Sequence, residues 1–145
     1  MIMFSQQDPR WANLQFGGGY TIGRYGCVIS CLTMARNWFF NDNKTPDWAA
    51  RLLLFSSGAV IWSSISNIGL RFVQRVFGRN DAVINEALIN PNKCCLIQVN
   101  NNHWLWLIGR LVPGRGWKVV DPWHGDICYT DRYGNNITGC AVISK

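Results

Sequence analysis

The sequence predicts an α+β fold in which N-terminal helices pack on a C-terminal antiparallel sheet. Apolar residues follow mostly a helical spacing up to about residue 88. From residue 94 onward, short apolar runs alternate with turn residues, which is typical of strands. The chain has 145 residues and shows no internal repeat, linker or low-complexity segment. We therefore expect residues 1–145 to form a single domain.

Residues 1–25 are expected to be irregular, because Asp8-Pro9 and the glycines at 17–19 interrupt regular structure. An amphipathic helix is predicted over residues 27–40, and Asn41 to Asn43 should end it. Its buried face would consist of the side chains at i, i+4, i+7, i+8 and i+11, which are Cys27, Cys31, Met34, Ala35 and Trp38.

Three further helices and one strand are expected before the main sheet. A helix is predicted from Trp48 to about Leu54. Thr45 can cap this helix, and Pro46 suits its first turn. The segment 56–58 should form a loop. A short helix is predicted over 62–68, a strand over 71–77 and a helix over 80–88.

The C-terminal half carries the remaining predicted strands. They cover residues 94–99, 103–110 and 117–120, with turns between them. Residues 128–130 and 139–143 are expected to pair as a hairpin across the polar segment between them.

Charge and hydropathy restrict the classes of function. The net charge of +6 favours polyanions such as nucleic acid, anionic lipid or cell-wall polymers. The basic residues are scattered, so we expect no nucleic-acid partner. No apolar run approaches the ~18 residues of a membrane span, and no N-terminal signal peptide is recognisable. We therefore expect the protein to be made in the cytoplasm. If it acts at a cell wall or in a virion, something other than a secretion signal must deliver it.

The six cysteines are expected to be free thiols, because the chain is long for a disulfide scaffold and carries no export signal. No C-x-x-C pair occurs, so no zinc site is expected. No other cofactor is predicted.

Cys27 follows a glycine-bearing loop at the predicted start of the 27–40 helix. Backbone N–H groups are unpaired at a helix start and carry partial positive charge, which favours a thiolate. Cys27 is therefore a candidate nucleophile, although a lone cysteine at such a position is also compatible with a core thiol. Cys31 lies one turn later and should be buried.

A cysteine nucleophile needs a base and a group that orients the base. His103 begins a predicted strand, and Asp121 ends the next one. If these strands are antiparallel neighbours, the carboxylate lies beside the imidazole, as in a catalytic triad. Taken singly, His103 could be a surface residue and Asp121 a turn residue. The competing base, His124, lies in a turn and should face substrate or solvent.

An oxyanion site needs donors near the nucleophile. The backbone N–H of Cys27 is one candidate, and a side-chain amide from the N-terminal segment could supply the other. Gln6 and Gln7 both have this chemistry.

Four segments resemble motifs of the family-39-like cysteine peptidases of the papain clan, which are related to the domains that trim double-glycine leader peptides. They are Ser5–Ala12, Thr21–Cys27, Asn102–Trp104 and Val120–Asp126, in the same order as in that family. The resemblance implies a papain-like peptidase fold. It also implies that Cys27 is the nucleophile and His103 the base. Asp121 would be the acid that orients His103, and Gln6 would be the oxyanion donor.

Three functions remain open at the sequence level. The first is a cysteine peptidase that acts on peptides. The second uses the same triad on peptidoglycan, as a cell-wall endopeptidase or amidase of the kind found among bacteriophage lytic enzymes. The third is a binding module without catalysis. The intact set of Cys, His, Asp and Gln argues against the third.

Overall fold

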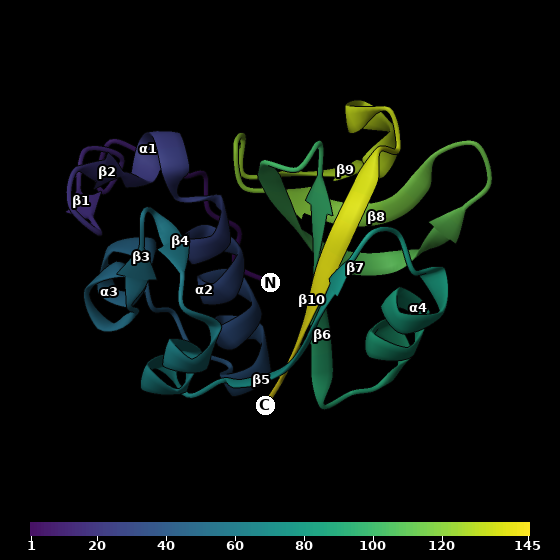
Figure 1. Cartoon of the computed structure of the whole chain (residues 1–145), viewed down its shortest axis with the longest axis horizontal. Helices are drawn as coiled ribbons and strands as arrows, with labels where there is room; N and C mark the ends of the chain where they lie inside the picture. Colours follow the sequence, from purple (N-terminus) through teal and green to yellow (C-terminus); the bar gives the residue numbers. More distant parts are fainter.

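The computed structural model describes residues 1–145, and Figure 1 shows a helical part beside a sheet. The helical part is built from α1 (Ile22–Tyr25), α2 (Cys27–Phe40), α3 (Pro46–Leu52) and the 3-10 helix η1 (Trp62–Ile68). It also holds two small antiparallel hairpins, which are β1 (Gln15–Phe16) with β2 (Tyr20–Thr21), and β3 (Phe55–Ser56) with β4 (Ala59–Val60).

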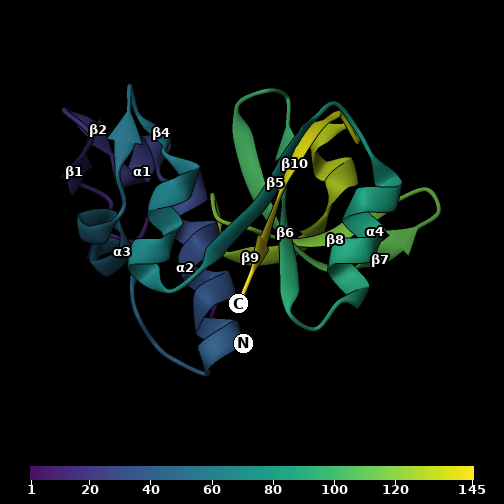
Figure 2. The same ribbon diagram turned by 60° about the horizontal axis from the view of Figure 1, so that its bottom comes forward.

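The main sheet is antiparallel, and its six strands lie in the order β5-β10-β6-β7-β8-β9. Their bounds are β5 Arg71–Phe77, β6 Lys93–Val99, β7 His103–Val112, β8 Gly116–Asp121, β9 Asp126–Tyr129 and β10 Ile137–Ser144. Figure 2 shows β5 leaving the helical part and running alongside β10 at the sheet edge. Helix α4 (Asp81–Ile89) connects β5 to β6, and the 3-10 helix η2 (Thr130–Tyr133) follows β9.

Both faces of the sheet are covered. Helix α2 packs on β7 on one face, and α4 packs on β6, β7 and β10 on the other. Successive residues of a strand point to opposite faces, so Leu96 joins the core beneath α2 and Ile97 joins the core beneath α4. Burial on both faces explains why the 94–97 segment is continuously apolar. The observed architecture confirms the predicted α+β class.

The prediction for α2 is confirmed in its bounds and wrong for one buried residue. Asn41 ends the helix in the left-handed conformation, with φ of 49°. Trp38 is 55% exposed, whereas Ile29 and Leu32 are buried although they lie off the predicted stripe. Burial is wider than one stripe because α2 also contacts α1 and α3.

The N-terminal segments are more regular than the sequence suggests. The glycines at 17–19 form the loop of the β1–β2 hairpin inside the region expected to be irregular. The expected loop at 56–58 is the turn of the β3–β4 hairpin, where Ser57 and Gly58 both have positive φ, as a type I′ turn requires. Thr45 precedes α3 as predicted but makes no side-chain capping bond, and the helix ends at Leu52.

The predicted hairpin between residues 128–130 and 139–143 is wrong. Strand β9 pairs with β8, whereas β10 lies between β5 and β6. Strand β10 is buried on both faces, through Cys140 and Val142 on one and Ala141 and Ile143 on the other. Such a strand belongs in the middle of a sheet, where it pairs on both sides.

None of the helices has the length and apolar character that crossing a membrane would require.

Candidate active site

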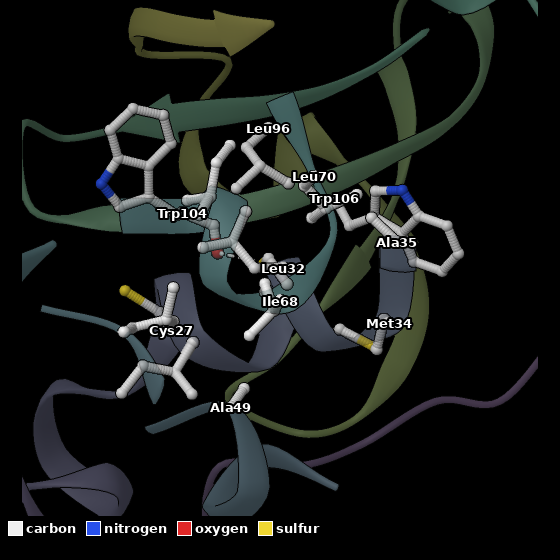
Figure 3. Packing of buried hydrophobic residues seen from close by; sticks show 14 of the residues in the cluster. Cys27, Leu32, Met34, Ala35, Ala49, Ile68, Leu70, Leu96, Trp104 and Trp106 are labelled. Carbon is white, nitrogen blue, oxygen red and sulfur yellow. Dashed lines mark hydrogen bonds between the residues drawn. The ribbon is translucent and has the colours of Figure 1, made fainter. Parts of the chain in front are cut away.

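Cys27 is the first residue of α2, where the chain turns from α1 into the longer helix. Within α2 its backbone N–H has no partner one turn earlier, because the helix starts here. The side chain is 8% exposed. Figure 3 shows Cys27 at this end of the helix, on the side of Trp104 of β7. The structure therefore places the thiol at a helix N-terminus, as the sequence predicts.

Gly26 allows the close turn between α1 and α2. A Cβ atom at Gly26 would lie 2.5 Å from the carbonyl oxygen of Ile22 and 2.7 Å from its Cγ2. Ile22 is fully buried, so neither atom can move freely. A side chain at position 26 would therefore displace the start of α2 and the thiol with it.

The Gly26→Ala variant should lose about 1–3 kcal/mol of unfolding free energy, because overpacking against backbone atoms cannot be relieved by rotamer changes. Gly23→Ala is the matched comparison, since its Cβ would approach Ala12 no closer than 3.0 Å. Urea unfolding measures both variants. A smaller loss for Gly26→Ala than for Gly23→Ala would contradict the proposed packing constraint.

His103 and Asp121 lie on neighbouring antiparallel strands, β7 and β8. Nε2 of His103 is 2.8 Å from Oδ1 of Asp121, and the carboxylate can only accept this hydrogen bond. The expected proximity of the two residues is thus confirmed. This hydrogen bond requires a proton on Nε2. Nδ1 is therefore the ring nitrogen that can accept the proton of the Cys27 thiol.

The environment of His103 favours the imidazolium. Burial lowers its pKa, but the hydrogen bond with Asp121 and the influence of the Cys27 side chain outweigh this effect and raise the pKa to about 9. Asp121 is fully buried. Burial raises the pKa of its carboxyl, but hydrogen bonds from His103 and Tyr133 hold that pKa well below its usual range. Asp121 is therefore a carboxylate that stabilises a positive charge on the imidazole.

Two residues that the sequence did not single out complete the surroundings of Asp121. The hydroxyl of Tyr133 donates to Oδ2 at 2.5 Å, and Nη1 of Arg132 donates to the same oxygen at 3.1 Å. Arg132 also binds Asp126 through both terminal nitrogens. The Tyr133 ring lies 5.2 Å from the His103 ring. Both residues come from η2, and nothing local in the sequence indicates that this segment folds back onto Asp121.

Tyr133→Phe should keep the ring against His103 and remove one donor from the buried carboxylate. We expect a loss of about 1.5–3 kcal/mol in unfolding free energy, the usual range for a hydrogen bond to a charged group. Chemical denaturation is the measurement. Tyr25→Phe is the control, because the exposed Tyr25 hydroxyl makes no hydrogen bond in the structure. Equal stability of the two variants would contradict a role for the Tyr133 hydroxyl.

Gln6 is buried and lines the same cleft as Cys27, but its amide nitrogen is not free. It lies 3.2 Å from the carbonyl oxygen of Gly23 and 3.4 Å from that of Ile22. Its side-chain oxygen is buried without a hydrogen-bond partner. Gln7 is more exposed, and its amide also donates to Gly23. In the structure the two amide contacts of Gln6 are thus directed at the backbone of α1, and its role as an oxyanion donor stays a prediction.

The other thiols and the second histidine lie away from this arrangement. Cys31 is fully buried, donates to the carbonyl oxygen of Trp104 at 3.5 Å, and has a pKa that burial raises well above its usual value. All six cysteines are free. As predicted for core thiols, the structure buries Cys94, Cys95 and Cys140. Cys128, for which a core position is also predicted, is only half-buried. His124 is exposed in a turn.

A cleft of about 790 Å³ runs past Cys27 and His103. Its walls are formed by the small hairpins and α1–α2 on one side and by the sheet on the other. Thirteen of its 22 lining residues are hydrophobic, and its aromatic residues are Phe16, Tyr20, Tyr25, Phe55, Trp62, Trp104, Trp123 and Tyr133. Such a cleft is suited to an extended chain molecule. No group of three or more His, Cys, Asp or Glu side chains is placed to hold a metal ion.

The chain is similar in structure to the peptidase domain of Streptococcus ComA, a bifunctional ABC transporter involved in a quorum-sensing pathway. The TM-score is 0.54 over 83% of this chain and 91% of that domain, at 12% sequence identity. This chain has a papain-like fold. No protein-family model and no curated protein sequence matches it. At this identity the likeness establishes the papain-like fold, and the roles of individual residues depend on the geometry described above.

Proposed function

We propose that this protein is a cysteine peptidase that hydrolyses amide bonds through Cys27, His103 and Asp121. The observation that supports this proposal best is the position of His103, which is hydrogen-bonded to a buried carboxylate and lines the same cleft as Cys27. The papain-like fold and the open cleft beside the thiol agree with it.

In the proposed reaction, His103 takes the Cys27 proton, and the thiolate sulfur attacks the carbonyl carbon of the amide. The carbonyl π electrons move to oxygen and form an oxyanion. The backbone N–H of Cys27 donates to this oxyanion, and Gln6 supplies a second donor when its amide turns from the α1 carbonyls. His103 then protonates the leaving nitrogen, and the C–N bond breaks to leave a thioester.

A water molecule completes the cycle. His103 removes its proton, the hydroxyl oxygen attacks the thioester carbon, and the C–S bond breaks. The acid product leaves, and the sulfur regains its proton from His103. Asp121 stays ionised throughout, and it orients the imidazole while stabilising the imidazolium.

A cell-wall peptide is the second candidate substrate. The net charge of +6 favours an anionic polymer, and the cleft is lined by two arginines, Arg24 and Arg75, and by no aspartate or glutamate. The triad would then act as a peptidoglycan endopeptidase or amidase, reaching the wall after release from the cell or as part of a virion.

Incubation with a mixed peptide library and with purified cell walls distinguishes the two substrates, with products identified by mass spectrometry. Cleavage of library peptides alone would support a peptidase, and new termini in the walls would support the second candidate. Cys27→Ala is the control in each case. Products that form equally with this variant would contradict both, and binding without cleavage would indicate a binding module.

A further inference from the structure

Arg75 lies on the sheet wall of the cleft and makes no ion pair in the structure. It belongs to the edge strand β5, and its side chain is half-buried. Burial lowers the pKa of its guanidinium. A half-buried charge that lacks an opposite charge is costly unless other groups or a ligand compensate it.

The protein holds this guanidinium in a fixed place. Its Cζ lies 4.2 Å from the centre of the Phe77 ring and 4.8 Å from that of Trp104. Nη2 donates to the side-chain oxygen of Gln98 at 3.1 Å, and Nη1 contacts the backbone carbonyl of Val76. These neutral contacts orient the group without neutralising its charge.

Gly139 makes room for this arrangement. It lies opposite Phe77 on β5 and opposite Gln98 on β6, so the Arg75 side chain crosses β10 at a residue without a side chain. A Cβ atom at Gly139 would lie 2.4 Å from Nη1 of Arg75. The sheet surface is therefore shaped to accommodate an arginine that reaches toward the cleft.

Part of the donor capacity of Arg75 is unused. The Nε–H has no acceptor, and Nη2 has one hydrogen besides the one it gives to Gln98. The Nε and Nη2 nitrogens form the edge with which Arg10 binds Asp8 and Arg79 binds Asp81 in this same protein. This edge matches the two oxygens of a carboxylate.

The rest of the cleft favours an anion as well. Its lining contains no aspartate or glutamate, whereas Arg24 and the imidazolium form of His103 are further positive charges. Asp121 is fully buried and already bound by His103, Arg132 and Tyr133. A substrate carboxylate near Arg75 would therefore meet positive charge and no nearby carboxylate of the cleft.

We propose that Arg75, positioned by Gln98, Phe77 and Trp104, binds a carboxylate of the substrate within the cleft. Resting on the proposed peptidase function, this assigns a preference for a peptide that places a carboxylate in the cleft beside Arg75. The carboxylate belongs to an acidic side chain or to the C-terminus of the peptide.

The test uses a cleaved peptide in which Glu is placed in turn at each position around the cut, with Gln at the same position as its partner. A second pair carries a free or an amidated C-terminus, which separates the two sources of the carboxylate. We expect kcat/KM to be about 10–100-fold higher for the charged member at one position, the range for a hydrogen-bonded charge. Arg75→Gln should abolish this difference, and Arg75→Lys should retain part of it.

Arg71→Gln is the matched control, because Arg71 lies exposed on the same strand and does not line the cleft. It should retain the wild-type preference, and circular dichroism verifies that all variants are folded. Cleavage of every charged and neutral pair at equal kcat/KM would overturn the carboxylate site and leave the peptidase function standing.

Absence of any cleavage would instead count against the peptidase function. The existence of the carboxylate site is then tested by measuring the binding of the same peptides, fluorescently labelled, by fluorescence anisotropy. Tighter binding of the charged member that disappears in Arg75→Gln supports the site. Equal binding of both members, or a preference that survives in Arg75→Gln, overturns it.

Discussion

Replacing Cys27 by Ala should abolish amide hydrolysis while the protein stays folded. Loss of a nucleophile in a triad removes the covalent route, so we expect a fall of at least about 10⁴-fold in kcat with the best substrate. The substitution removes a single sulfur atom from a side chain at the cleft surface, so the unfolding free energy should change by about 1 kcal/mol or less. Steady-state kinetics and urea unfolding of the same preparation measure the two effects.

Thiol labelling gives an independent measurement of the same assignment. Iodoacetamide should modify Cys27 before Cys94, although the two side chains are similarly buried, at 8% and 7% exposed. Cys27 lines the same open cleft as His103, whereas burial alone raises the pKa of Cys94. Peptide mapping by mass spectrometry identifies the order of labelling. Labelling of Cys27 no faster than that of Cys94 would favour a binding module over an enzyme.

Asp121→Ala is expected to be the most destabilising of the substitutions considered. The carboxylate accepts hydrogen bonds from His103, Arg132, Tyr133 and the backbone N–H of Trp123. Removing it leaves these donors unpaired around a buried site, which should cost about 3–5 kcal/mol of unfolding free energy. Asp121→Asn should cost less, since its oxygen can still accept from His103. Equal stability of the alanine variant and the wild type would contradict the network.

The same substitution should change how stability depends on pH. The pKa of His103 is raised from 6.5 to about 9, so its stabilising contribution is complete below about pH 6.5 and is lost as the pH rises through 9. In Asp121→Ala, burial still lowers the pKa of His103, while the hydrogen bond with Asp121 that contributes to raising it is gone. The decline in stability between pH 6.5 and 9 should therefore be weaker in the variant.

The titration itself can be followed by NMR. The chain has two histidines, so a His124→Gln background leaves His103 as the sole histidine signal. Its midpoint should move from about pH 9 in the parent to a clearly lower pH in Asp121→Ala. An unchanged midpoint would show that Asp121 does not stabilise the imidazolium.

Several features of the site follow from local sequence signals. The break before residue 27 and the helical spacing after it placed Cys27 at the start of α2, because helix boundaries depend on neighbouring residues. The strands at 103–110 and 117–120 are joined by a short turn, and strands joined in this way usually pair antiparallel. The proximity of His103 and Asp121 could therefore be predicted from their positions at the two strand ends.

Other features depend on contacts that local patterns do not report. The sequence predicted a β9–β10 hairpin because the segments are neighbours in the chain, yet β10 is inserted between β5 and β6. The apolar residues of β10 indicate that the strand is buried, but they do not identify the strands that pair with it. Similarly, Trp38 has the spacing of a buried residue and is 55% exposed.

The sequence by itself determined the fold class, the start of the α2 helix at Cys27 and the pairing of His103 with Asp121. Only the tertiary structure decided that Arg132 and Tyr133 bind Asp121, that the Gln6 amide faces α1, and that Arg75 crosses β10 to the cleft. The physical reason is the range of the interactions. Hydrophobic periodicity and capping residues indicate the backbone conformation and the buried face of one segment. The contacts above join side chains from elements that come together only when the sheet is assembled.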